Sequence, residues 1–159
     1  DLMVAHPPCT NLAVSANKWY KPENLHHDPA KPQKRADAIE FFMKLANANI
    51  NHIAIENPKC IMSGQWRKAD QVTQPFHFGD PIRKEIHLWL KDLPKLIHTD
   101  LVEPEDFFYN SKRTKSGKSR YSKFGKLGSG KGKERSVFFP RIAEQMAIQW
   151  SEYILNLKS

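Results

Sequence analysis

The chain has 159 residues, of which 40% are hydrophobic, with four tryptophans and nine phenylalanines. This length and composition favour one folded domain with a real core and exclude an intrinsically disordered chain. No apolar run approaches the roughly 20 residues of a membrane span, and the first residues do not form a secretory signal pattern. Two cysteines, Cys9 and Cys60, are too few for a disulfide framework, so we expect a cytoplasmic protein without a membrane partner.

The positive charge of the chain lies in one segment. The net charge is +8, and segment 112–135 holds ten lysines and arginines against one acid, so the rest of the chain is close to neutral. Glycine and serine alternate with these cations, which predicts a flexible basic loop at about 111–136. With Tyr121 and Phe124 available for base stacking, the loop favours contact with DNA; a solvated loop without a ligand is the alternative. The residues expected to contact DNA are Lys112, Arg113, Lys115, Lys118, Arg120, Lys123, Lys126, Lys131 and Lys133.

The first elements in chain order predict a strand, a helix and a second strand. Residues 2–5 form a short apolar run typical of a buried parallel strand, which His6-Pro7-Pro8 ends because proline has no donor for the sheet ladder. A polar loop or lid follows at 11–32. An amphipathic helix is then expected within 33–50, with its core side at Ala38, Phe41, Phe42, Leu45 and Ala46. A second strand at 53–55 completes a right-handed parallel crossover.

Later segments predict two more strands and a terminal helix. Residues 72–78 and 85–90 are expected strands joined by a Gly-Asp-Pro turn. The helix begins near Pro140 and has core residues at Ile142, Ala143, Met146, Ile148 and Trp150. The sequence therefore predicts a single α/β domain over 1–159. Because the chain begins directly on an apolar strand, we also expect that upstream sequence is missing.

Cys9 and Glu56 each follow the end of a predicted strand. The carboxyl ends of parallel strands meet at the same edge of a sheet, so both side chains are expected to face one crevice. A cysteine thiolate is a nucleophile, and a partly buried carboxyl group can deliver a proton. This pair suits attack on an electron-poor ring that is activated at a nitrogen. The alternatives are a buried structural thiol at Cys9 and a surface or helix-capping acid at Glu56.

A zinc site is a further interpretation of the histidines and the second cysteine. The residues that invite it are His6, His26, His27 and Cys60. Their spacings match no common ligand pattern, so we predict no metal.

Four motifs resemble those of a known family. The chain has AHPPCT at 5–10, AIENP at 54–58, QPFHFGDP at 74–81 and FFPRIAEQMAIQW at 138–150. In this order they resemble motifs IV, VI and VIII and the terminal segment of DNA cytosine-5 methyltransferases, most closely the short phage and prophage forms. The resemblance spans nearly the whole chain. It implies a partial Rossmann-like methyltransferase fold, with a mostly parallel sheet, flanking helices and a basic loop insertion.

The resemblance also implies roles for individual residues. Cys9, in the turn with Pro8, would add to ring carbon 6 of a flipped-out cytosine. Glu56 would bind and protonate ring nitrogen 3, with Asn57 and Pro58 holding it in place. Carbon 5 would then accept a methyl group from S-adenosylmethionine. The target base must leave the stack at a cost of a few kcal/mol, which phosphate contacts from the basic loop would offset.

The chain departs from the family at two places. Motif VIII of the family usually supplies a Gln-x-Arg pair, and this chain has Ile82 and Lys84 there with Arg83 between them. Arg83 or Lys84 is therefore at best a substitute. The glycine-rich motif and the acidic residue that bind the methyl donor are absent, so we expect this chain to lack the N-terminal S-adenosylmethionine-binding half.

Two other functions remain open beside the methyltransferase. A catalytically silent DNA-binding remnant of the same fold would explain the altered motif VIII and the missing donor motif. A thymidylate-synthase-like nucleotide enzyme would share the Pro-Pro-Cys nucleophile, but the basic loop and the ENP motif disfavour it.

Overall fold

The computed structural model describes residues 1–105, 107–108, 120–121 and 138–157. The chain divides into two compact units, neither continuous in sequence. Unit 1 comprises Asp1–Val72 and Glu85–Lys95, and unit 2 comprises Thr73–Lys84 and Leu96–Ser159. The prediction of a single domain stays a prediction.

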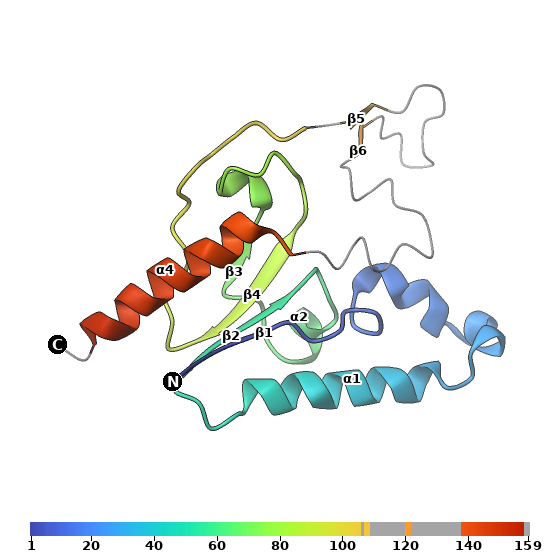
Figure 1. The fold of residues 1–159 in the computed structure, drawn as a ribbon. Helices are drawn as coiled ribbons and strands as arrows, with labels where there is room; N and C mark the ends of the chain where they lie inside the picture. Colours follow the sequence, from blue (N-terminus) through green and yellow to red (C-terminus); the bar gives the residue numbers. More distant parts are fainter. Residues whose placement is uncertain (106, 109–119, 122–137, 158–159) are drawn as a thin grey trace. The chain divides into compact units, whose positions relative to one another are not determined.

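A mixed sheet contains four of the strands (Figure 1). In the described residues, β1 (Leu2–Ala5), β2 (His52–Asn57), β4 (Ile86–Lys91) and β3 (Gln71–Thr73) form one sheet in the order β1-β2-β4-β3. β1 pairs with β2 in parallel, whereas β2 pairs with β4 antiparallel. The α/β class is thus confirmed, and the mostly parallel sheet is wrong.

The connection between β2 and β4 explains this error. It contains the four-residue helix α2 (Met62–Gln65) and β3, but no long helix. A parallel return needs a crossover that carries the chain back to the starting edge of the sheet, usually through a helix. Without that crossover, β4 enters at the edge where β2 ends and runs antiparallel beside it.

Helix α1 (Lys31–Ala46) covers one side of the β1–β2 pair in unit 1 (Figure 1). Its Phe42 is fully buried and packs in a cluster with Ile53, Ile55 and Trp89; the Phe42 and Trp89 rings meet edge to face at 5.2 Å. Phe41, expected in the core, is 47% exposed. Neighbouring helical residues are about 100° apart, so Phe41 turns away when Phe42 faces the sheet.

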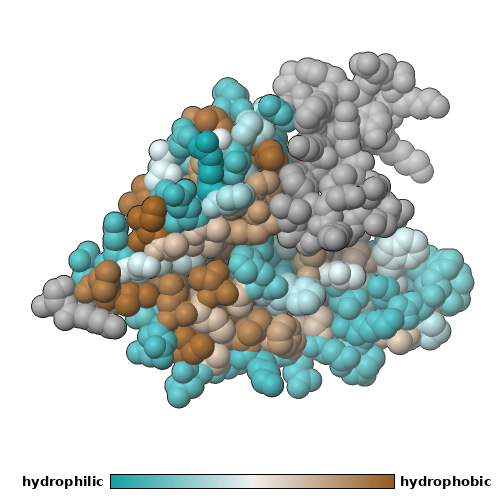
Figure 2. All heavy atoms as spheres, in the orientation of Figure 1, coloured by the Kyte–Doolittle hydropathy of each residue, from teal (hydrophilic) through white to brown (hydrophobic). Residues whose placement is uncertain are grey.

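Two further expectations for unit 1 are corrected. β1 is an edge strand, and Leu2 and Val4 are each 37% exposed, so its apolar run marks a half-buried edge and not a fully buried strand. The expected loop at 11–32 contains two 3-10 helices, η1 (Val14–Tyr20) and η2 (Pro22–His27). Figure 2 shows hydrophilic side chains over this part of unit 1, and apolar periodicity therefore gave no signal for these helices.

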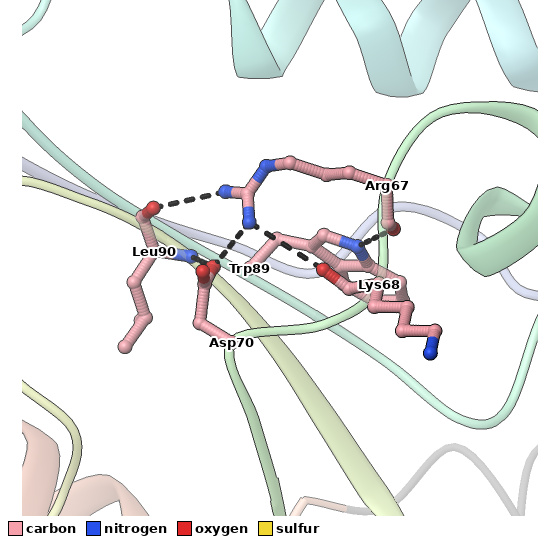
Figure 3. Close-up of polar contacts among 5 residues, drawn as sticks. All are labelled: Arg67, Lys68, Asp70, Trp89 and Leu90. Atoms are coloured by element: carbon pink, nitrogen blue, oxygen red, sulfur yellow. Dashed lines mark hydrogen bonds and ion pairs between the residues drawn. The ribbon is translucent and has the colours of Figure 1, made fainter.

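A polar clamp fastens segment 66–70 to β4 (Figure 3). Asp70 Oδ2 accepts hydrogen bonds from Arg67 and from the Leu90 backbone N–H, both at 2.6 Å. Arg67 also donates to the Leu90 carbonyl at 2.9 Å, and its own carbonyl accepts from Trp89 Nε1 at 2.9 Å. The clamp satisfies backbone groups on the side of β4 away from β2.

Unit 2 contains η3 (Pro75–His77), β5 (Phe107–Phe108) paired with β6 (Arg120–Tyr121), and the terminal helix α4 (Pro140–Asn156). The prediction of α4 is confirmed. Its buried residues follow one stripe at four-residue spacing, Ile142, Met146 and Trp150, whereas Ala143 and Ile148 are exposed.

The predicted strand at 72–78 is wrong beyond Thr73. Pro75 has no N–H for a ladder and starts η3 instead. The Gly-Asp-Pro turn is present, and Gly79 has a positive φ of 90° that an L side chain rarely adopts. A Cβ there would also displace the ends of the Arg141 and Asp100 side chains; the positive φ is the reason that this position favours glycine.

Candidate functional site

The register of the parallel pair brings the two predicted motifs together. Ala5 lies beside Ile55 in the last pair of the β1–β2 ladder. One residue further, His6 Nδ1 lies 3.1 Å from Glu56 Oε2. One residue further again, Asn57 Nδ2 donates to the Pro7 carbonyl at 2.8 Å. Side-chain bonds therefore continue the strand pairing past its end and hold the Pro-Pro-Cys turn against the Glu-Asn-Pro turn.

Glu56 and Asn57 differ in their surroundings because adjacent strand residues point to opposite faces. Asn57, on the same face as Ile55, is fully buried. The Glu56 side chain is 11% exposed, and the His6 ring that contacts it is 42% exposed. Among the described residues, Glu56 Oε1 has no hydrogen-bond partner, since His6 binds Oε2. One carboxylate oxygen is thus held, and the other can accept a ligand.

The turn that carries Cys9 is fixed by backbone hydrogen bonds. The Cys9 carbonyl accepts from the N–H groups of Leu12 and Ala13 at 3.0 and 2.8 Å. Ala13 in turn forms a bridge with Cys60, in the segment that follows β2. The Cys9 side chain is partly exposed, as a reactive thiol requires.

The second cysteine has a different character. Cys60 is 2% exposed. Burial raises the pKa of the Cys60 thiol, and charges on Cys9 and Glu56 raise it further, against a lowering effect of the Met62 backbone N–H. Cys60 is therefore a protonated, unreactive thiol. It interacts electrostatically with both candidate catalytic groups, Cys9 and Glu56.

His87 of β4 lies directly opposite Asn57 in the antiparallel ladder. It is 7% exposed, and neither ring nitrogen has a hydrogen-bond partner among the described residues. Burial lowers the pKa of the His87 imidazole, and the carboxylates of Glu85 and Glu56 offset this only in part. A buried, neutral histidine thus lies behind the Glu-Asn-Pro turn.

A shallow cavity of about 320 Å³ opens beside the Cys9 turn. It runs from the turn to the exposed face of α1, where Phe41 presents its ring and Lys34 and Asp37 present charges. Its lining residues are Pro8, Asn11, Lys34, Asp37, Ala38 and Phe41.

The remaining predicted site residues do not belong to unit 1. Arg83 and Lys84 belong to unit 2, where Arg83 lies over the Phe76 ring at 5.4 Å and Lys84 over the Phe139 ring at 5.3 Å. Their participation in catalysis stays a prediction. Of the nine residues expected to contact DNA, Arg120 lies in β6, and the other eight fall outside the described residues.

Sequence reasoning missed the contact of His6 with Glu56, because it considered His6 only as a zinc ligand. The signal was available, because His6 and Glu56 both follow directly after the strands whose shared edge was predicted. His87 gave no signal, since its position opposite Asn57 depends on the antiparallel pairing. In the part of the chain that the structure describes, no group of three or more His, Cys, Asp or Glu side chains is placed to hold a metal ion.

Comparisons with known proteins add no relative to this picture. No protein-family model, curated protein or solved structure matched the chain. None of the helices in the described ranges is long and apolar enough to cross a bilayer.

Proposed function

We propose that this chain carries the base-attacking half of a DNA cytosine-5 methyltransferase site. Cys9 is the nucleophile, Glu56 binds and protonates the base, and Pro8 and Asn57 fix the two turns that present them. The observation that carries the proposal is the joining of these turns by the His6–Glu56 and Asn57–Pro7 hydrogen bonds, at 3.1 and 2.8 Å.

The chemistry begins with a flipped cytosine between the two groups. The Cys9 thiolate forms a bond to ring carbon 6, and the electron pair of the carbon 5–carbon 6 double bond moves into the ring. Glu56 gives a proton to nitrogen 3, which prevents negative charge from accumulating on the ring. Carbon 5 then has enamine character and can take an electrophile. Loss of a proton from carbon 5, departure of the Cys9 sulfur as the thiolate and return of the nitrogen 3 proton to the Glu56 carboxylate restore the neutral aromatic base.

The described residues do not fit the methyl donor, S-adenosylmethionine. Nucleotide-type cofactors are commonly held by a glycine-rich turn whose backbone approaches the ligand closely. Unit 1 contains one glycine, Gly64, and a Cβ there would meet open space. The proposal therefore covers addition to the base and protonation, and derives no step through the donor.

The predicted basic loop supports the choice of DNA as the substrate. Its segment 112–135 carries a net charge of +9, and cations that neutralise phosphates supply much of the affinity for nucleic acid.

We also propose a cytoplasmic location for this protein. Both cysteines are free, as is usual for proteins of a reducing compartment.

Exchange at carbon 5 tests the proposal without a methyl donor. The full chain is incubated in D₂O with duplex oligonucleotides containing cytosine, and deuterium in the recovered deoxycytidine is measured by mass spectrometry. Addition of Cys9 lets carbon 5 take a solvent deuteron, and elimination returns labelled base. We expect Cys9→Ser to abolish the label and Glu56→Gln to slow its uptake by about 100-fold or more, with Cys60→Ala as the matched cysteine control. Deuterium no higher than in an enzyme-free blank would exclude this function.

The altered motif VIII favours one second candidate, a silent DNA-binding remnant. Ile82 and Lys84 replace the polar pair that the family directs at the base. Such a protein would bind the same duplex with a steep salt dependence but leave carbon 5 unlabelled. Label on free deoxycytidine monophosphate and none on duplex DNA would instead indicate a nucleotide enzyme.

A further inference from the structure

We infer that His6 is a positioning residue for Glu56: it holds one carboxylate oxygen so that the other is aimed at the bound base. This inference rests on the proposed function, because it assigns His6 a part in the reaction of that same site. The contact that carries it joins His6 Nδ1 to Glu56 Oε2 at 3.1 Å.

The fold dictates this contact. Met3 and Ala5 of β1 pack against the core, so His6 alternates to the opposite face, as do Leu2 and Val4. Glu56 alternates to that face of β2 after Ile55. The strand register thus pairs the positions of His6 and Glu56, and the alternation of side chains places both on the same face of the sheet.

Glu56 needs a partner of this kind. A nearly buried carboxyl group without hydrogen bonds is costly and poorly oriented. Among the described residues, His6 is the one side chain that bonds it. Two other titratable groups interact electrostatically with Glu56, namely His87 and Cys60. Neither of them hydrogen-bonds the carboxylate, so the orientation of Oε1 depends on His6.

The exposure of His6 limits what this hydrogen bond contributes to folding. The His6 side chain is 42% exposed and that of Glu56 is 11% exposed, so the bond contributes less to stability than one between two fully buried groups. The reaction rate depends on the bond as well, because a small misplacement of a proton donor slows the reaction strongly. Removing His6 should therefore lower turnover and cost some stability, while the chain still folds.

A spectroscopic experiment tests the contact independently of activity. Which imidazole nitrogen carries the proton is set by its hydrogen bonds, and long-range ¹H–¹⁵N NMR reports the tautomer of each neutral histidine. His52 is an internal reference, since its Nδ1 must donate to the Asp92 carbonyl at 2.6 Å. We expect His6 to show the same Nδ1–H tautomer as His52 in the native chain. In Glu56→Ala, His6 should lose that preference while His52 keeps it.

Carbon 5 exchange then tests the role in the reaction. We expect His6→Ala to lower the exchange rate at saturating duplex by about tenfold, with half-saturation by DNA unchanged. His6→Asn, whose amide can donate from a similar position, should restore most of the rate. In a Glu56→Gln background, His6→Ala should have no further effect. His52→Ala, at the opposite end of the same strand pair, is the matched control and should stay within about twofold.

Each failure has a separate meaning. A His6 tautomer that does not respond to Glu56→Ala overturns the inference whatever the activity. A normal tautomer response with wild-type exchange in His6→Ala also overturns it, and leaves the proposed function intact. A normal tautomer response with no exchange by the native chain overturns the proposed function and the catalytic role of His6 together, while the contact itself stands.

Discussion

The buried amide of Asn57 offers the sharpest test of how the site is built. Asn57 is fully buried, and its Nδ2 donates to the Pro7 carbonyl at 2.8 Å. Asn57→Ala removes the donor, and the Pro7 carbonyl is left in a buried position without a partner. The turn before Cys9 then loses the side-chain bond that anchors it to β2.

The expected loss of stability follows from three contributions. An unpaired buried acceptor costs about 1–3 kcal/mol, and the space left by the amide costs roughly 1 kcal/mol. Asn57 Oδ1 already lacks a partner among the described residues, so its removal returns roughly 1 kcal/mol. The unfolding free energy should therefore fall by about 1–3 kcal/mol in Asn57→Ala. Asn57→Asp should lose more, because it places an oxygen against the Pro7 carbonyl and a carboxylate in a fully buried position.

Two measurements check this prediction. Urea denaturation gives the change in unfolding free energy, with Asn49→Ala as the control, because Asn49 is an exposed asparagine on the surface of unit 1. The rate of Cys9 alkylation by iodoacetamide in native buffer should rise in Asn57→Ala as the turn loosens, and buried Cys60 should stay unreactive. A stability within 0.5 kcal/mol of the control, together with an unchanged alkylation rate, would refute the claim that Asn57 anchors this turn.

Two further predictions concern stability. Asp70→Ala removes the clamp on β4 (Figure 3). Because the Arg67–Asp70 pair is partly exposed, we expect the unfolding free energy, measured by urea titration, to fall by only about 1–2 kcal/mol. Lys68→Ala is the control at an exposed neighbouring residue and should change the unfolding free energy by less than about 0.5 kcal/mol. Because burial lowers the pKa of His87, the unfolded chain takes up a proton near the usual histidine value of about 6.5 before the folded chain does. The unfolding free energy should therefore fall as the pH drops from 7 to 5, and His87→Gln should lessen that fall; equal pH slopes in the two proteins would contradict the assignment.

The local elements could be predicted because each carries its own signal. The β1 run and its terminating prolines, the amphipathic stripe of α1 and the Pro140 start of α4 depend on neighbouring residues alone. The shared edge of the two motifs could also be predicted, since one helix between two strands implies a parallel pair. For this reason the sequence could predict that Glu56 lies at the same sheet edge as the Cys9 turn.

The remaining features depend on contacts between distant segments. The antiparallel position of β4 is set by the path of the chain between β2 and β4, which periodicity does not reveal. Phe41 and Phe42 are adjacent phenylalanines in one helix, so the sequence does not show which of them is buried. The rotation of α1 against the sheet places Phe42 in the core and Phe41 in the cavity wall. His87 became part of the site environment through the same unpredicted pairing.

The corrected sheet strengthens the case for the site. In the mixed sheet β2 lies between β1 and β4, so ladders on both sides fix its register, with Glu56 opposite Leu88 and Asn57 opposite His87. A slip of one residue would turn every side chain of β2 to the other face. The carboxylate would then enter the packed side of the sheet, and the anchoring amide would leave it. A strand with one free edge could slip at much lower cost, so the antiparallel partner that the sequence did not predict is what keeps the carboxylate of Glu56 beside His6 and the Cys9 turn.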